Sequence, residues 1–172
     1  QMEYRQLGKS TLQISRIGFG AMSLRPLEND PQKLLCTAID MGINFLDTAD
    51  LYDKGLNEAA IGKALQKRRQ EIILATKVGN QWRPDGSGWD WNPHKAYIIK
   101  AAEESLKRLQ TDYIDLYQLH GGTIDDPIDE TIEAFEQLQQ QGKILFYGIS
   151  SIRPNVIREY VHRSNIISVM MQ

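Results

Sequence analysis

Short apolar runs in this sequence end at polar or charged residues, and stretches with helical spacing lie between them. Five of these runs end, in chain order, at Asp47, Lys77, His120, Ser150 and Gln172. If the runs are parallel strands, these five side chains lie at one rim of a sheet, where β/α barrels carry their catalytic groups. A carboxylate, an amine, an imidazole, a hydroxyl and an amide at one rim indicate a chemical site rather than a packing pattern.

Apolar residues recur at helical spacing in five segments that alternate with the strand-like runs. These segments are 34–39, 61–65, 98–109, 128–138 and 156–161. Asn57 is expected to cap the second helix, since an asparagine side chain satisfies the free N–H groups at a helix start. This alternation predicts a parallel sheet built from right-handed β-α-β units.

Two architectures satisfy this alternation, the doubly wound sheet and the (β/α)8 TIM barrel. A dinucleotide-binding doubly wound sheet carries Gly-x-Gly-x-x-Gly after its first strand. Here the apolar run 17–22 continues as Gly18-Phe19-Gly20-Ala21-Met22-Ser23 and lacks the third glycine, which favours the barrel. We expect an α/β fold in which residues 1–172 form a single incomplete barrel. Residues 1–15 form an N-terminal β-hairpin plug, and 16–172 supply six strands and five helices, where a closed barrel has eight of each.

Bulk composition excludes several classes of partner. The chain has 172 residues, 41% of them hydrophobic and 24% charged, and a net charge of −2. This balance favours neither nucleic acid nor an anionic membrane surface, and no apolar run reaches the length of a membrane span. The lone Cys36 forms no internal disulfide, in keeping with a reducing compartment. We therefore expect a cytoplasmic protein, monomeric or weakly homo-oligomeric.

Four of the polar residues fit one chemical task. Tyrosine, with a reference pKa of about 10, donates a proton poorly near neutrality, and an adjacent ammonium lowers such a pKa. Lys77 is placed to supply that ammonium to Tyr52, and Asp47 to hold Lys77. His120 is placed to orient a substrate oxygen. This set suits protonation of a carbonyl oxygen while its carbon accepts a hydride.

Each of the four residues also has a structural interpretation when taken alone. Asp47 with Thr48 and Ala49 resembles a helix-capping turn, and Tyr52 a half-buried packing residue. Lys77 suits a surface position, and His120 a hydrogen-bonded core position. Their shared location, at strand ends or in the loop that follows, favours a site with perturbed pKa values.

At these residues the chain resembles the aldo-keto reductases. The motifs that carry the resemblance are 42–52 (GINFLDTADLY) with Asn57-Glu58 and Ile61-Gly62, then 73–77 (ILATK), 112–120 (DYIDLYQLH) and 148–151 (GISS). Four separate motifs occur in the family's order and span nearly the whole chain. The resemblance implies a β/α barrel that reduces aldehydes or ketones with NADPH. It also implies a catalytic tetrad, namely Asp47, Tyr52, Lys77 and His120.

The resemblance further implies residues that bind the cofactor. Ala21 and Met22 would flank the nicotinamide and its ribose, Ser150 and Gln172 would bond the carboxamide, and Asp47 would contribute to the same site. Ser151 stands where many relatives carry asparagine or arginine. The family's 2′-phosphate pocket follows the seventh and eighth strands, so these residues do not distinguish NADPH from NADH.

Three tryptophans follow Lys77 in a glycine-containing loop. Trp82 and Trp89 are candidates for an aromatic wall that binds a small carbonyl substrate together with His120. The alternative is a loop in which Trp82, Trp89 and Trp91 pack on one another.

Other motifs are rejected. Gly8-Lys9-Ser10 is no phosphate loop, because Glu3 occupies the position of the required first glycine. The three histidines are widely spaced and form no His-x-His or His-Glu-x-x-His, so no metal site is expected. Two functional alternatives to a reductase stay open: a nicotinamide-nucleotide-binding regulatory protein, and an inactive fragment of a reductase whose sheet edges associate with another chain.

Overall fold

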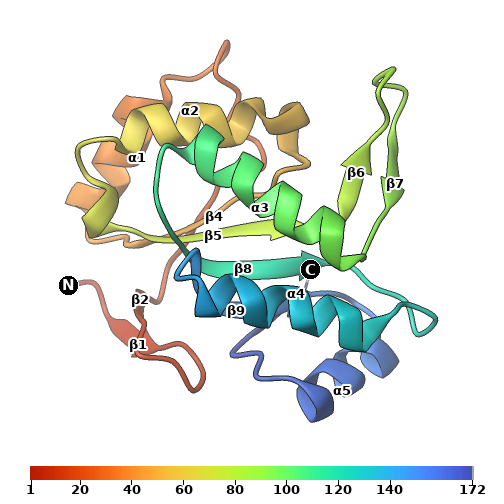
Figure 1. Ribbon diagram of the computed structural model, residues 1–172. Coiled ribbons are helices and arrows are strands. Elements are labelled where there is room, and N and C mark those ends of the chain that lie inside the picture. The colour runs from red at the N-terminus through yellow and green to blue at the C-terminus, as the bar shows by residue number, and fades with distance from the viewer. Residues whose placement is uncertain (172) are drawn as a thin grey trace.

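The computed structural model describes residues 1–171 (Figure 1). A six-stranded parallel sheet consists of β3 (Phe19–Gly20), β4 (Phe45–Asp47), β5 (Ile73–Val78), β8 (Ile114–His120), β9 (Ile144–Ser150) and β10 (Val169–Met170). Its helices are α1 (Pro31–Asp40), α2 (Leu56–Leu65), α3 (Lys95–Leu109), α4 (Ile128–Gln140) and α5 (Pro154–Arg163), with short 3-10 turns η1 (Tyr52–Gly55) and η2 (Arg69–Glu71). Two antiparallel hairpins pair β1 (Tyr4–Gln6) with β2 (Gln13–Ser15), and β6 (Asn80–Trp82) with β7 (Trp89–Trp91).

The order of the strands distinguishes the two predicted architectures. Neighbours in the sheet follow chain order from β3 through β4, β5, β8 and β9 to β10, with no reversal of direction. Successive helices also pack against one another, α1 on α2, α2 on α3, α3 on α4 and α4 on α5. A doubly wound sheet would reverse its strand order at a switch point. The sheet is therefore a curled half-barrel with its helices around the outside (Figure 1), and the predicted barrel architecture is confirmed.

The two hairpins lie at opposite ends of the strands (Figure 1). The β6–β7 hairpin projects from the carboxyl end, directly after β5. The β1–β2 hairpin lies at the amino end, where the Tyr4 hydroxyl donates to the carbonyl of Gly42 at 2.8 Å. At its turn, Gly8 has φ +55°, and a Cβ there would lie 2.0 Å from the carbonyl oxygen of Ile167. Only glycine fits this close approach between the hairpin and the segment before β10.

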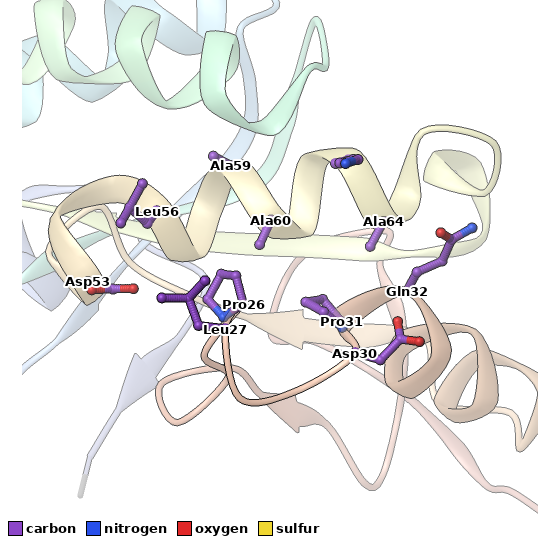
Figure 2. Close-up of a pocket in the computed structure, with 11 residues that line it drawn as sticks. Pro26, Leu27, Asp30, Pro31, Gln32, Asp53, Leu56, Ala59, Ala60 and Ala64 are labelled. Carbon is purple, nitrogen blue, oxygen red and sulfur yellow. The ribbon is translucent and has the colours of Figure 1, made fainter.

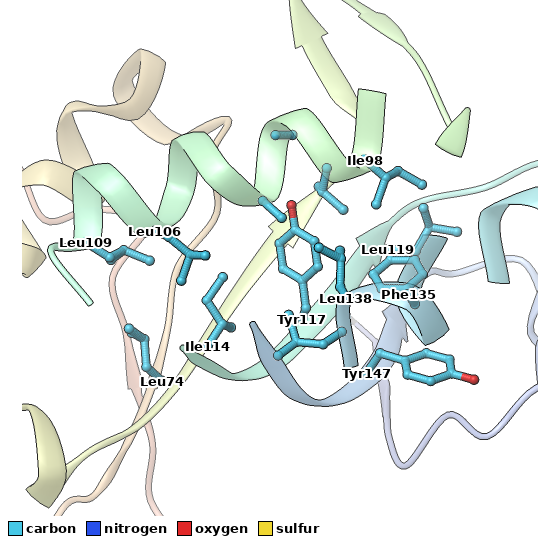
Figure 3. Close-up of a cluster of buried hydrophobic side chains, with 14 of the residues drawn as sticks. Leu74, Ile98, Leu106, Leu109, Ile114, Tyr117, Leu119, Phe135, Leu138 and Tyr147 are labelled. Carbon is cyan, nitrogen blue, oxygen red and sulfur yellow. The ribbon is translucent and has the colours of Figure 1, made fainter. Parts of the chain in front are cut away.

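The hydrophobic core lies between the sheet and its helices (Figure 3). Three aromatic side chains join β8, α4 and β9 there. The rings of Tyr117 and Phe135 meet edge to face at 5.6 Å, and those of Phe135 and Tyr147 stack at 5.4 Å. Each of these side chains is at most 1% exposed. Outward-facing side chains of the strands thus pack against the helices. The residues that alternate with them along each strand face the inside of the half-barrel.

The predicted cap of α2 is wrong. Asn57 lies inside the helix, fully buried, and Gly55 precedes the first turn. The side-chain amide nitrogen of Asn57 donates to the carbonyls of Ala21 and Leu24 at 2.7 and 2.9 Å, and its amide oxygen accepts from the Thr48 hydroxyl at 2.6 Å. Tertiary partners compete with the helix terminus for this side chain. As a result Asn57 fixes the loop after β3 to the loop after β4.

Candidate active site

Lys77 stands at the centre of the predicted tetrad. Its ammonium nitrogen lies 2.5 Å from Oδ2 of Asp47, 2.9 Å from the carbonyl oxygen of Thr48 and 3.2 Å from the hydroxyl of Tyr52. The rings of Tyr52 and His120 meet edge to face, with centroids 6.1 Å apart. The structure therefore brings all four predicted catalytic side chains into one cluster at the carboxyl end of the sheet.

Strand register explains this convergence. Asp47 is the last residue of β4, Lys77 the fifth of six in β5, and His120 the last of β8. Lys77 pairs with Gln118 across the sheet, and His120 pairs with Ser150. Side chains alternate along a strand, so Lys77, Gln118 and His120 all face the inside of the half-barrel.

Tyr52 begins a turn with an unusual backbone. Asp53 and Lys54, which follow it, have φ values of 49° and 52°, in the left-handed region that residues with a Cβ rarely adopt. The Lys54 ammonium lies 5.3 Å from the Trp82 ring centre and 3.5 Å from the carbonyl oxygen of Gly86. These contacts join the Tyr52 turn to the β6–β7 hairpin and help to hold a conformation that is costly by itself.

The cluster is largely shielded from water. Lys77 is 2% exposed, and the Asp47 side chain is 16% exposed, so their ion pair is weakly screened. Burial, reinforced by the positive charge of Lys77, lowers the pKa of His120 to about 4. His120 is consequently a neutral imidazole near pH 7, with one N–H donor and one acceptor nitrogen. Its Nδ1 is buried without a hydrogen-bond partner among residues 1–171.

Gln118 also belongs to the cluster, although it is not among the residues predicted from the sequence. Its amide nitrogen donates to Oδ1 of Asp47 at 2.9 Å, so Gln118 and Lys77 between them hold both carboxylate oxygens. Gln118 is fully buried. A polar residue inside the apolar run 113–119 was the available signal, because a buried amide requires a hydrogen-bond partner.

Ala21, Met22 and Ser150, three of the predicted cofactor residues, end or directly follow strands at the same rim. Ala21 is fully buried, and its N–H donates to the carbonyl oxygen of Asp47 at 2.9 Å, whereas Met22 is 62% exposed. Ser150 lies beside His120 at the end of β9. Gln172, the predicted carboxamide partner, lies outside the described residues.

A pocket of about 440 Å³ opens beside the tetrad. Its lining includes His120, Ser150, Trp91 and Arg153. The Trp91 indole nitrogen donates to both carboxylate oxygens of Asp126, at 3.0 and 3.1 Å, which fixes its ring at this pocket. Trp91 is thus the tryptophan that lines the pocket with His120.

Trp82 and Trp89, the predicted substrate residues, pair with each other on the β6–β7 hairpin. Their ring centres are 5.1 Å apart in an edge-to-face arrangement, and Trp89 is 49% exposed. This geometry matches the alternative in which the loop packs on its own rings. Trp82 remains connected to the Tyr52 turn through Lys54.

A second hollow, of about 630 Å³, lies on the outer surface between α1, α2 and the loop that precedes α1 (Figure 2). Pro26, Leu27, Pro31, Leu56 and Ala60 give it a largely apolar lining. None of the four predicted catalytic residues lines it. His120, by contrast, lines the pocket beside the tetrad.

Two classes of feature are missing from residues 1–171. No cluster of three or more His, Cys, Asp or Glu side chains there is arranged to hold a metal ion. In the same part of the chain no helix combines the length and apolarity required to cross a bilayer.

The sequence profile of the Aldo/keto reductase family matches residues 16–172. Over 171 residues the chain is 63% identical to the uncharacterized oxidoreductase YqkF of Bacillus subtilis, covering 99% of this chain and 56% of that protein. Its fold superimposes on the aldo-keto reductase AKR11C1 of Bacillus halodurans, holo form, with a TM-score of 0.96 and 63% identity, over 100% of this chain and 58% of that one. The chain is also similar to an aldo/keto reductase of Klebsiella pneumoniae solved with NADP and acetate, with a TM-score of 0.77 and 31% identity over 92% of this chain and 53% of that one.

The chain belongs to the aldo/keto reductase family, and its half-barrel represents part of that family's (β/α)8 barrel. It spans a little over half the length of the relatives it matches.

Proposed function

We propose that the protein containing this chain reduces a small aldehyde or ketone to an alcohol, with a reduced nicotinamide nucleotide as the hydride source and Tyr52 as the proton donor. The observation that carries this proposal is the contact of the Lys77 ammonium with Tyr52 at 3.2 Å and with Asp47 at 2.5 Å. A phenol beside a buried cation is a proton donor whose conjugate anion is stabilised where it forms.

The side chains divide the work. Tyr52 releases its proton to the carbonyl oxygen, and the positive charge of Lys77 stabilises the negative charge left on the phenol oxygen. Asp47 keeps Lys77 oriented, and Gln118 in turn fixes Asp47. His120, neutral near pH 7, offers a hydrogen bond that orients the carbonyl oxygen toward Tyr52.

The pocket beside the tetrad is suited to a nicotinamide. It places the Ser150 hydroxyl next to His120, so a donor or acceptor for a carboxamide lies beside the group that orients the substrate. Ala21 and Met22 follow β3, where the Ala21 N–H donates to the carbonyl oxygen of Asp47, and their contribution and that of Gln172 are predictions. The chemistry that a bound reduced nicotinamide contributes is a hydride for the carbonyl carbon.

NADPH is the form of the cofactor that we propose. The support is the Klebsiella pneumoniae relative solved with NADP. Preference over NADH depends on a pocket for the 2′-phosphate, which the resemblance assigns to the seventh and eighth strands.

The decisive test is Tyr52→Phe, measured on the complete polypeptide that the gene encodes. The variant removes the proton donor and keeps the ring, so we expect turnover of a simple aldehyde with NADPH to fall by about 10² to 10⁴-fold. NADPH binding, measured by fluorescence, should persist. Tyr4→Phe is the matched control, since Tyr4 lies at the opposite end of the sheet. Turnover of Tyr52→Phe equal to that of Tyr4→Phe would refute the proposal.

A further inference from the structure

A second buried polar cluster lies behind the tetrad, on the outer face of β5. Glu58 of α2 is fully buried, and its Oε1 accepts from the hydroxyls of Thr76 and Ser105 at 2.8 and 3.0 Å. Its Oε2 accepts from Nε of Arg108 at 3.1 Å. One carboxylate therefore joins α2, β5 and α3.

This cluster touches the catalytic elements at two points. Thr76 precedes Lys77 in β5, and its side chain faces away from the tetrad because alternate residues of a strand point to opposite faces. Gly55 ends the turn that Tyr52 begins, and it rests directly on Arg108. A Cβ at Gly55 would lie 2.9 Å from Cδ and 3.0 Å from Nε of Arg108. Movement of Glu58 or Arg108 therefore displaces the supports of both Lys77 and Tyr52.

The turn after Tyr52 depends on such support. Asp53 and Lys54 have left-handed backbone conformations, which persist only where surrounding structure imposes them. Lys54 contacts Trp82 on one side of the turn, and Arg108 supports Gly55 on the other. Without the packing of Arg108 against Gly55, the turn is free to relax. The distance from the Tyr52 hydroxyl to the Lys77 ammonium is then no longer fixed.

Charge balance adds a second connection. Asp50, two residues before Tyr52, is 8% exposed and has an unpartnered Oδ1 among residues 1–171. Burial and then the charge of Glu58 raise the pKa of Asp50 well above its usual range, and Arg108 opposes them. Loss of Arg108 would remove the positive charge that opposes the buried carboxyl groups of Asp50 and Glu58, an arrangement that is costly in a medium of low dielectric constant.

We propose that Glu58 and Arg108 are positioning residues for catalysis, which set the distance between the Tyr52 hydroxyl and the Lys77 ammonium from the far side of the sheet. This inference rests on the proposed function for its kinetic consequences. Neither side chain lines the pocket beside the tetrad, so the effect passes through Thr76, Gly55 and the charge balance at Asp50.

The experiment compares this ion pair with another one on the same sheet. Arg69 and Asp115, 2.7 Å apart with side chains 13% and 8% exposed, form a buried pair at the amino end, remote from the tetrad. Glu58→Gln, Arg108→Met and Arg108→Lys are made in the complete polypeptide, with Asp115→Asn as the matched control. Each variant is assayed well below its own unfolding temperature, so that only folded protein contributes.

Kinetic results separate positioning from stability. We expect Glu58→Gln and Arg108→Met to lower kcat by about tenfold or more, since misplacement of a catalytic group by an ångström has such effects. KM for NADPH should change less than twofold. Arg108→Lys, which keeps the charge and most of the stem, should recover kcat to within about threefold of wild type. Asp115→Asn should lose stability and keep kcat.

A spectroscopic measurement makes the inference testable without turnover. Tyrosine labelled with ¹³C at Cζ reports the surroundings of the Tyr52 hydroxyl, and Tyr52→Phe assigns its signal. The signal should move in Glu58→Gln and Arg108→Met and stay in place in Asp115→Asn. If Glu58→Gln fails to fold, Thr76→Val supplies a milder loss of the same contact.

The possible outcomes are distinct. An inactive wild type refutes the proposed function, and the Tyr52 signal then decides the positioning role alone. A Tyr52 signal and kcat that respond no more to Glu58→Gln and Arg108→Met than to Asp115→Asn overturn the inference.

Discussion

The amino and carboxyl ends of strands β5 and β8 lie in two different polar environments. At their amino end, Arg69 donates to the Thr111 hydroxyl, to the carbonyls of Ile72 and Tyr113, and to Asp115, all between 2.7 and 2.9 Å. At their carboxyl end, Lys77 is equally well paired, yet the neighbouring Gln118 Oε1 and His120 Nδ1 lack partners among residues 1–171. The first end is saturated, whereas the second retains unused hydrogen-bonding capacity next to a pocket.

This difference fits the proposed function, in which one end of the sheet stabilises the fold and the other end carries the chemistry. In β/α barrels the amino end serves stability and the carboxyl end carries catalysis. An ion pair whose hydrogen-bonding groups all have partners has no free donor or acceptor for a ligand. Buried polar atoms without partners cost folding free energy unless a ligand or a reacting group bonds to them. We therefore expect substitutions at the two ends to differ in kind.

Lys77→Met should have the largest effect. It leaves the Asp47 carboxylate without its cation and removes the positive charge beside Tyr52, so we expect turnover to fall by about 10³-fold. The measurement is steady-state kcat for aldehyde reduction, with circular dichroism to verify folding. A folded Lys77→Met variant with kcat within tenfold of wild type would contradict the catalytic role of the carboxyl end.

Asp115→Asn should affect stability alone. Removal of one partner from a buried ion pair leaves Arg69 uncompensated, and we expect the free energy of unfolding to drop by about 3 kcal/mol. Urea denaturation measures this loss, and kcat of the folded variant should stay within twofold of wild type. A parallel fall in kcat would erase the distinction between the two ends.

The smallest effect concerns pH and His120. Its pKa of about 4 lies below the unfolded value of 6.5, so the neutral form favours the folded state. The associated stability is fully present above pH 6.5 and is lost as pH falls toward 4, by at most about 3 kcal/mol at the acid end. His120→Asn removes this dependence. The free energy of unfolding is measured between pH 4 and 7.5 for the wild type and for His120→Asn. The two values should converge as pH falls, and a constant difference between them would rule out a buried neutral His120.

Much of the site followed from residue order. Asp47, Lys77 and His120 were predicted to meet because each ends an apolar run, and parallel strands end at the same rim. Tyr52 joined them because its loop directly follows β4. Gln118 was missed because an amide within an apolar run looks like an ordinary strand residue until its partner, 71 positions away in the chain, is known.

Side-chain partners that are distant in the chain account for what the sequence pattern did not predict. Asn57 is of a residue type that often caps helices, yet its side chain forms hydrogen bonds with the loops after β3 and β4. The substrate role of Trp82 and Trp89 stays a prediction, and the structure adds that Asp126 fixes Trp91 at the pocket with His120. Both cases involve a hydrogen bond between segments more than 30 residues apart, which no local pattern encodes.

The sequence by itself determined the alternation of strands and helices, the barrel-like order of the sheet and the rim at which the polar residues gather, because periodicity and strand polarity are local properties of the chain. Only the tertiary structure decided which faces of β5 carry Thr76 and Lys77, how Gly55 rests on Arg108, and which tryptophan reaches the pocket. Those features depend on contacts closed across the fold, whose distances are fixed by packing rather than by spacing along the chain.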